Sequence, residues 1–304
     1  MSVTTSPISP TSLPAAEPTK FNFKAFSSLA KLRLSFLVVF SGAIAFTIGK
    51  HGNVGAFEVV MFSLGGFFNT ISANIINQIF EIGPDSRMLR TKARPLPMGQ
   101  ISAQFAWLLS IGFGLLAIAI FWIFFNPLTV ILGVASLVLY GFIYTPIKKI
   151  SPLAVAIGAV PGAMPLLIGY VAATNKIDAF ALILFVHQFI WQFPHFWSIA
   201  WVLDEDYARG GFRLLPGRGS SKDGPAAVLM LVYSLFLIPI GCLPYLVGLC
   251  TVNSAVISIA AGIGFTGYAV MFAARRDTAS ARKLMFASFF YLPIVQLVFL
   301  FCLA

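Results

Sequence analysis

The side chains able to do chemistry are concentrated in one stretch, residues 74–97, which lies directly between two long apolar segments. On a helix, Asn74, Asn77 and Glu81 fall at i, i+3 and i+7, so the three side chains share one face. Asp85 would extend that face by one more turn. Carboxylates beside arginines at the mouth of an apolar bundle suit a divalent cation and the phosphates that it bridges.

Gly83 and Pro84 interrupt this face. A proline inside a helix removes a hydrogen bond and clashes with the preceding turn, so we expect the helix to kink or end near Gly83 and Asp85 to lie on the loop beyond it. A cytoplasmic loop anchored to lipid head groups would explain the basic residues that follow, but not the polar side chains within the apolar segment, where they are costly. These basic residues are Arg87, Arg90, Lys92 and Arg94.

A second acidic cluster, Asp204-Glu205-Asp206, follows the sixth apolar segment and lies on the same side of the membrane. Mg²⁺ is normally held by one or two carboxylates together with substrate phosphates, so two clusters at one membrane face predict two half-sites. The alternative is a solvated loop whose carboxylates neutralise Arg209 and Arg213.

A histidine lies deeper in the membrane below the second cluster. His195, Val202 and Asp206 are spaced i, i+7 and i+11, which predicts one shared helical face. The imidazole could contact a bound ligand, hydrogen-bond within the bundle, or ligate iron. Large flat side chains nearby suit a planar ligand, or else they only pack or mark a membrane interface. They are Trp191, Trp197 and Trp201.

The segment 140–165 is rich in small residues and prolines, which let membrane helices approach closely and break helices around a cavity. Lys148 and Lys149 lie on the cytoplasmic side of this segment. They could reach a diphosphate, or they could simply anchor the helix to the membrane face.

The composition is that of an integral membrane protein. Of the 304 residues, 59% are hydrophobic and 10% are charged, against about 25% charged in a soluble domain. The net charge of +10 follows the membrane topology and does not indicate nucleic acid. The three cysteines lie in or beside apolar segments without metal-type spacing, so we expect them to be small apolar packing residues. They are Cys242, Cys250 and Cys302.

A membrane span needs about 20 apolar residues, and the sequence offers nine such segments. We therefore predict an all-α integral membrane fold of about nine transmembrane helices. Residues 1–24 read as a disordered cytoplasmic tail rather than a cleaved signal peptide, and residues 25–304 as a single polytopic membrane domain. The predicted spans are 32–49, 57–80, 103–124, 127–145, 152–173, 179–201, 226–248, 253–274 and 284–303.

The orientation follows from the basic residues. Every Lys and Arg except Lys50 and Lys176 falls in the N-terminal tail or in the loops after the even-numbered spans. By the positive-inside rule the N-terminus is cytoplasmic and the C-terminus lies on the opposite side. For a multi-pass protein of this kind we expect the cell inner membrane.

Several motifs together resemble the UbiA superfamily of intramembrane prenyltransferases, and in particular its haem-farnesylating branch. The resemblance covers roughly residues 25 to 304. Two departures stand in the first motif, where Glu81 replaces the usual aspartate and Gly83-Pro84 replaces a charged stretch. The matching motifs are Asn77-x-x-x-Glu81-x-x-x-Asp85, Met88-x-Arg90-Thr91-x-x-Arg94-Pro95, Phe193-Pro194-His195-Phe196-Trp197, Asp206-Tyr207 and Leu215-Pro216.

The resemblance implies nine spans around a central cavity and transfer of a farnesyl group from farnesyl diphosphate to haem B, giving haem O. Haem B is then a substrate and Mg²⁺ the cofactor. Membrane lipid and, as protein partners, a haem A synthase or oxidase assembly factors are also implied. The implied site has three parts: metal ligands Asn77, Glu81, Asp85 and Asp206, diphosphate-binding Arg90, Arg94 and Lys148, and haem-binding His195 and Trp197.

Two other functions remain open at this stage. A UbiA-type prenyltransferase acting on a quinone precursor or another aromatic acceptor would carry the same first motif. A secondary transporter would also have nine or ten spans, but the sequence shows no internal repeat, and its carboxylates cluster at one membrane face rather than at the midplane.

Overall fold

The computed structural model describes residues 23–217, 222 and 224–302, and this part of the chain contains nine helices long and apolar enough to cross a membrane. The predicted all-α membrane fold is therefore confirmed. The spans are α2 (Leu32–Gly49), α3 (Ala56–Phe80), α5 (Ala103–Phe124), the continuous run Pro127–Ile147, α8 (Ala154–Thr174), α9 (Ala179–Val202), α11 (Gly224–Leu246), α12 (Val252–Arg275) and α13 (Thr278–Phe301).

Six shorter elements complete the described chain. The fourth span consists of α6 (Pro127–Val138), a π-helical turn η1 (Leu139–Tyr144) and α7 (Thr145–Ile147). Three more helices lie outside the spans: α1 (Phe23–Ala30), α4 (Ile82–Arg87) and α10 (Asp204–Gly210). Helix α1 includes the last two residues assigned to the tail, and the rest of the predicted tail lies outside the described residues.

Polar residues in the connections between spans determine where several helices begin. The side chains of Ser102, Asn126, Asp178 and Asp277 each accept a hydrogen bond from a backbone N–H in the first turn that follows. The cap at Asp277 starts α13 at Thr278, whereas hydropathy predicts a start at 284, because Arg282 and Lys283 lower the apolar signal of the first turns.

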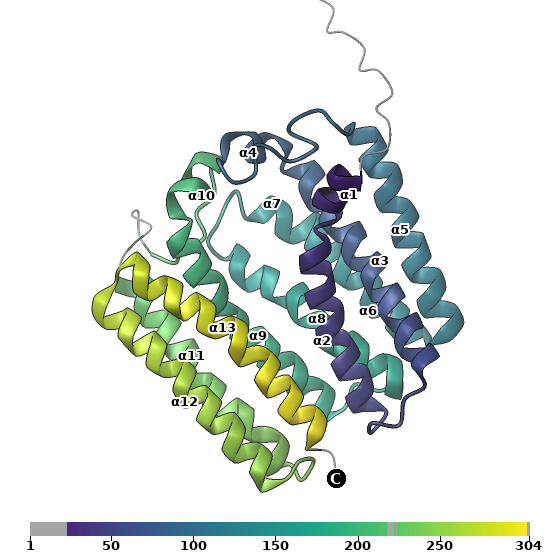
Figure 1. The fold of residues 1–304 in the computed structure, drawn as a ribbon, viewed down its shortest axis with the longest axis vertical. Coiled ribbons are helices and arrows are strands. Elements are labelled where there is room, and N and C mark those ends of the chain that lie inside the picture. Colours follow the sequence, from purple (N-terminus) through teal and green to yellow (C-terminus); the bar gives the residue numbers. More distant parts are fainter. Residues whose placement is uncertain (1–22, 218–221, 223, 303–304) are drawn as a thin grey trace, which may run out of the picture.

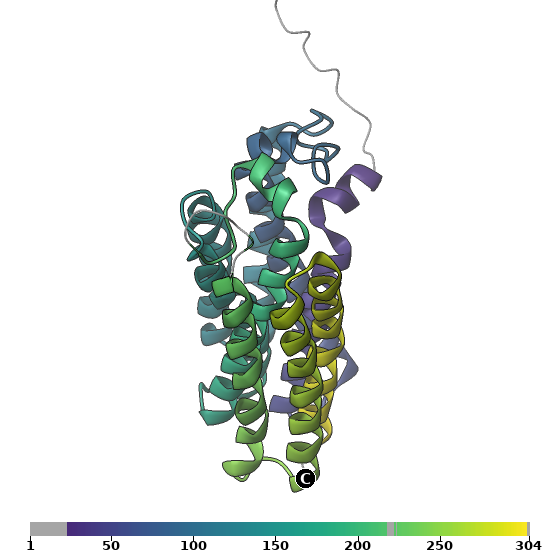
Figure 2. The same cartoon turned by 90° about the vertical axis from the view of Figure 1, so that its left-hand side faces the viewer.

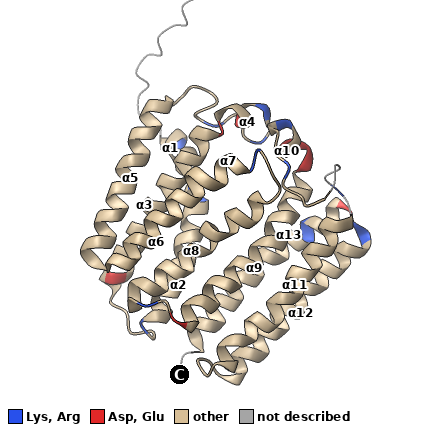
Figure 3. Cartoon of the chain, turned by 180° about the vertical axis from the view of Figure 1, so that it is seen from behind, with Lys and Arg blue, Asp and Glu red and all other residues tan. Residues whose placement is uncertain are grey.

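The spans lie side by side along the long axis of the molecule, with α1, α4 and α10 at one end and the C-terminus at the other (Figures 1 and 2). Helix α2 packs on α3, α8 and α13, while α9 packs on α8, α11 and α13. Helices α2, α8, α9 and α13 thus close a ring. Charged residues gather at the two ends of the bundle (Figure 3).

The contact between α2 and α8 requires glycine. A Cβ on Gly169 would lie 2.1 Å from the carbonyl oxygen of Gly42, which is backbone and cannot move aside. Helix α8 also carries Pro161 and Pro165 inside the span. The small residues of this segment therefore act as predicted and let two helices approach closely.

Two of the cysteines do not act as packing residues, so that prediction is wrong for them. Cys250, between α11 and α12, forms a disulfide with Cys302 at the end of α13, with their Cα atoms 5.1 Å apart. They are 52 residues apart in sequence, but the α12–α13 hairpin returns the chain to the same membrane face. Cys242 is free and partly buried.

Candidate active site

The first acidic motif spans the junction of α3 and α4. Helix α3 ends at Phe80, Glu81 caps it with φ −104° and ψ 8°, and α4 begins at Ile82. The predicted interruption near Gly83 is thus present, but the prediction that Asp85 lies on a loop is wrong. Pro84 falls in the first turn of α4, where its missing N–H breaks no intrahelical bond, so Asp85 is helical.

The three predicted ligands of this motif are all buried. Asn77 and Glu81 are each 2% exposed, and Asp85 is fully buried. Asn77 donates through Nδ2 to Glu81 Oε1 at 2.8 Å and to Thr145 Oγ1 at 3.1 Å. The predicted shared face of Asn77 and Glu81 therefore exists, and it points into the bundle toward the fourth span.

Two of the predicted diphosphate-binding cations pair with these carboxylates. Arg94 Nη1 lies 2.6 Å from Asp85 Oδ2, and Lys148 forms an ion pair with Glu81. We call Asn77, Glu81, Asp85, Arg94 and Lys148 the carboxylate centre. Its members come from three parts of the chain: the α3–α4 junction, the loop after α4, and the end of the fourth span.

One oxygen of this centre has no partner. Asp85 Oδ1 is buried and accepts no hydrogen bond from any residue in the described part of the chain. A buried carboxylate oxygen without a donor is costly, and it marks a position where a ligand is expected to bind.

Lys31 also belongs to this site, although no motif in the sequence points to it. It lies between α1 and α2 with φ 47°, and its Nζ donates to Asn77 Oδ1 at 3.0 Å. Burial, followed by the nearby Arg94 guanidinium, lowers the pKa of Lys31 to about 7. In sequence Lys31 is only a lysine at the edge of a span, which the positive-inside rule already explains.

The end of the fourth span positions Lys148. The π-helical turn η1 is followed by Thr145, whose hydroxyl donates to the Tyr140 carbonyl at 2.8 Å. π-Helical turns in α-helices frequently occur at functional sites. The Lys148 amine lies 4.6 Å from the ring centroid of buried Phe212, so the segment after α10 covers this amine.

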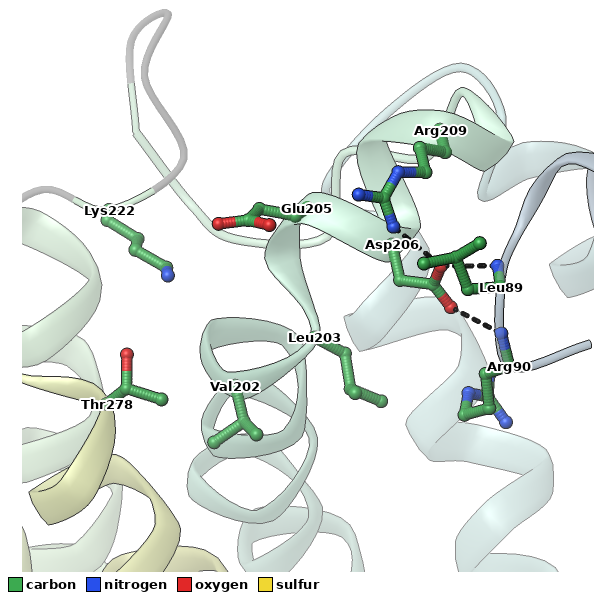
Figure 4. Close-up of a pocket in the computed structure, with 9 residues that line it drawn as sticks. All are labelled: Leu89, Arg90, Val202, Leu203, Glu205, Asp206, Arg209, Lys222 and Thr278. Atoms are coloured by element: carbon green, nitrogen blue, oxygen red, sulfur yellow. Dashed lines mark hydrogen bonds and ion pairs between the residues drawn. The ribbon is translucent and has the colours of Figure 1, made fainter.

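Asp206, the fourth predicted ligand, is held differently from the other three. Its Oδ1 accepts from the Leu89 N–H at 2.7 Å, and its Oδ2 accepts from the Arg90 N–H at 3.2 Å (Figure 4). Arg209 lies 3.5 Å from Oδ1. Asp206 thereby ties α10 to the loop after α4. Within the described residues, no three His, Cys, Asp or Glu side chains form a group that could hold a metal ion by themselves.

The three predicted diphosphate-binding residues therefore do not share one site. Arg94 and Lys148 lie on the carboxylate centre, whereas Arg90 lines a different pocket with Asp206 and Arg209 (Figure 4). The predicted single helical face from His195 to Asp206 is also absent, because Leu203 ends α9 and α10 begins as a separate helix.

His195 lies in α9 and faces α13. Its Nδ1 is 2.7 Å from Ser288 Oγ, and Ser288 Oγ donates to the Met285 carbonyl. Because the hydroxyl has one proton, His195 Nδ1 is the donor to Ser288, and the lone pair of Nε2 is left for another partner.

The ring beside His195 is Trp191 rather than Trp197. Trp191 stacks on the imidazole with ring centroids 4.4 Å apart and an interplanar angle of 17°. Trp197 instead packs edge-on against Tyr233 of α11 at 5.4 Å. The predicted pair His195 and Trp197 therefore lies on different sides of α9.

A polar seam between α9 and α13 was not predicted from the sequence. His187 Nε2 is 3.0 Å from the Tyr291 hydroxyl, and Gln296 Nε2 donates to Gln188 Oε1 at 3.2 Å. Trp191 Nε1 donates to the Ser288 carbonyl at 3.0 Å. His187, Gln188, Gln192 and His195 share one helical face, so their spacing in the sequence could have pointed to this seam.

The comparisons with known proteins agree with this architecture. A family model for the UbiA prenyltransferase family matches residues 37–292. The protoheme IX farnesyltransferase of Cytophaga hutchinsonii is 44% identical over 277 residues, which cover 91% of this chain and 96% of the relative. The mitochondrial protoheme IX farnesyltransferase of Homo sapiens is 36% identical over 90% of this chain and 61% of its own length.

Solved structures share the fold at low sequence identity. A structure described for digeranylgeranylglyceryl phosphate synthase has a TM-score of 0.77 at 19% identity, covering 92% of this chain and 98% of that chain. A UbiA homologue from Archaeoglobus fulgidus, bound to GPP and Mg²⁺, has a TM-score of 0.66 at 16% identity, covering 90% and 99%.

The fold and these matches define the class as an intramembrane prenyltransferase. The chain belongs to the UbiA prenyltransferase family and, within it, to the protoheme IX farnesyltransferases. The resemblance stated from the sequence motifs is confirmed.

Proposed function

We propose that this chain transfers the farnesyl group of farnesyl diphosphate to a vinyl group of haem B, with addition of water, to give haem O. The product would be passed to haem A synthesis and terminal oxidase assembly. The observation that carries the proposal is the carboxylate centre, buried at one end of a nine-span bundle whose relatives are named for this reaction.

The centre fits a divalent cation. Asp85 offers an oxygen without a donor, and Glu81 and Asn77 offer further oxygens beside it. We propose that these three residues hold Mg²⁺ and that Asp206 contributes from α10 through Oδ2, which among the described residues accepts one hydrogen bond, from the Arg90 N–H. When bound, Mg²⁺ would supply positive charge that stabilises the negative charge of the diphosphate. Glu81 in place of the usual aspartate remains an oxygen ligand.

The cations of the centre would bind the diphosphate. Arg94, Lys148 and Lys31 lie around the same carboxylates, so an incoming diphosphate would find positive groups already oriented. The C1–O bond of the substrate breaks and the diphosphate leaves with the electron pair. These three cations then stabilise the leaving group, and Phe212 covers Lys148 and limits the access of water.

The acceptor would bind against α9. The vinyl carbon of haem attacks the allylic cation, a carbon–carbon bond forms, and water adds to the resulting cation with loss of a proton. We propose that His195, through Nε2, and the stacked Trp191 contact the haem, while Trp197 supports α9 from the α11 side.

The membrane and orientation belong to the same proposal. We place the chain in the cell inner membrane, with the carboxylate centre on the cytoplasmic side and the C-terminus opposite. The distribution of Lys and Arg supports this orientation. The Cys250–Cys302 disulfide gives independent support, because it lies at the opposite end of the bundle and disulfides persist in oxidising compartments.

The test is a product analysis. Membranes containing the chain are incubated with haem B, farnesyl diphosphate and Mg²⁺, and the extracted haems are analysed by mass spectrometry. A new haem heavier by one farnesyl group plus one hydroxyl group is expected. Unchanged haem, in a preparation that prenylates a quinone precursor, would contradict the acceptor. No consumption of the diphosphate with any acceptor would favour transport.

A further inference from the structure

A second charged pocket lies at the same end of the bundle, outside the carboxylate centre. It has a volume of about 320 Å³ and is bounded by the end of α9, the first turn of α10 and the first residue of α13 (Figure 4). Its lining includes Arg90, Arg209 and Lys222, whereas none of the five residues of the carboxylate centre lines it.

The charge of this pocket favours an anion. Three cations face two carboxylates, Glu205 and Asp206. Asp206 is already engaged by two backbone N–H groups and by Arg209. Arg90 and Lys222 have exposed side chains, and no ion pair is formed by either of them within the described chain. Their charges are therefore available to a ligand.

The pocket lies at one end of the polar seam between α9 and α13 that contains His195. Val202 lines it from α9 and lies seven residues after His195, which places both on nearly one helical face and about 10 Å apart. On α13, Thr278 lines the pocket and Phe289 lies eleven residues further along the same face. The Phe289 ring meets the His195 ring edge-on at 5.0 Å.

We propose that this pocket binds the propionate carboxylates of the haem acceptor. The inference rests on the proposed function and deepens it. Protohaem is a flat apolar ring with two propionates on one edge. With those carboxylates on Arg90 and Lys222 at the membrane face, the macrocycle extends down the α9–α13 seam toward His195. This arrangement keeps the carboxylates out of the hydrocarbon, where charge is costly, and leaves the vinyl groups inside the bundle.

The proposal gives Arg90 a different role from Arg94. Although they are four residues apart in one loop, Arg94 pairs with Asp85 and Arg90 lines the second pocket. The diphosphate of one substrate and the propionates of the other would then bind separate sets of cations. Neither substrate would compete with the other for these cations.

The experiment compares haem B with its dimethyl ester, whose propionates carry no charge. Binding to the purified full chain is followed by the Soret absorbance, and KM values for haem and farnesyl diphosphate are measured in parallel. The variant is the double substitution Arg90→Gln and Lys222→Gln. The matched control is Lys92→Gln, which removes an exposed cation from the same loop without touching the pocket.

We expect the double variant to weaken haem B binding about tenfold or more, the amount expected for lost hydrogen bonds to charged groups, and to leave ester binding and the KM for farnesyl diphosphate unchanged. The control variant should bind haem B like the wild type. Equal haem B binding by wild type and double variant, or an increase in the KM for farnesyl diphosphate instead, would overturn the propionate site. Failure of the wild type to farnesylate any haem would overturn the proposed function instead, since haem binding is measured independently.

Discussion

The two acidic stretches of this chain look alike in sequence and differ in the structure. Each follows a long apolar helix at the same end of the bundle. In the first, Asn77, Glu81 and Asp85 are buried and paired with cations, and one oxygen of Asp85 has no partner in the described part of the chain. In the second, the Asp206 carboxylate accepts hydrogen bonds from two backbone N–H groups of the loop after α4. Burial and partners, rather than acidic spacing alone, therefore distinguish the buried ligands of the carboxylate centre from Asp206, a proposed auxiliary ligand that also anchors the loop.

The largest effect is expected at Asp85. Asp85→Asn removes the charge of the oxygen that lacks a partner, so turnover should fall about a thousandfold or more, as for loss of a central electrostatic contact. Glu81→Gln should lower turnover by a similar factor. The measurement is the rate of haem farnesylation at saturating Mg²⁺. Glu58→Gln, in the exposed ion pair at the other end of α3, is the matched control and should retain wild-type activity.

Substitution of Lys31 tests whether the carboxylate centre includes a residue far from the first acidic stretch in sequence. Lys31→Met keeps the length of the side chain but removes the cation that contacts Asn77, so kcat/KM for farnesyl diphosphate should fall about a hundredfold. Arg33→Gln, an exposed cation two residues away, should cause little change. Equal activity of the Lys31 and Arg33 variants would remove Lys31 from the site.

Asp206 tests the second region directly. Asp206→Asn keeps one oxygen that can accept the Leu89 N–H, so we expect a loss of about tenfold in kcat/KM, clearly smaller than for Asp85→Asn. Asp206→Ala, which leaves both N–H groups without this acceptor, should be worse than the asparagine variant. A loss as large as that of Asp85→Asn would mean that the two acidic regions contribute equally.

The smallest effect on activity is expected far from both regions. Cys302→Ser removes the disulfide that closes a loop of 52 residues, which constrains the unfolded chain by up to about 4 kcal/mol in the chain-entropy model. The thermal unfolding temperature in detergent should fall, while kcat stays near the wild-type value. Equal unfolding temperatures for the Cys302→Ser variant and the oxidised wild type would show that the disulfide does not stabilise the fold.

Sequence alone predicted the framework because hydropathy and residue spacing are local properties. The nine spans, the end of α3 near Gly83 and the shared face of Asn77 and Glu81 all follow from spacing along the chain. The sequence does not predict helix α4, because the rule that a proline ends a helix does not apply to Pro84, which lies in a first turn where proline is tolerated.

The missed features depend on tertiary contacts. Lys31 meets Asn77 across 46 residues, and Cys250 meets Cys302 across 52. No local pattern encodes either pairing. The choice of Trp191 over Trp197 depends on which side of α9 faces α13. Because α9 packs on α8, α11 and α13, several of its sides are apolar and buried, and hydropathy alone does not distinguish the side that faces α13.

The most direct test of the account is equilibrium binding of a non-reactive farnesyl diphosphate analogue, measured with and without Mg²⁺. The wild type should bind the analogue tightly only with Mg²⁺. Asp85→Asn should lose this metal-dependent part of the affinity, and Asp206→Asn should keep most of it. Metal-dependent binding by Asp85→Asn equal to that of the wild type would contradict the assignment of the diphosphate to the carboxylate centre.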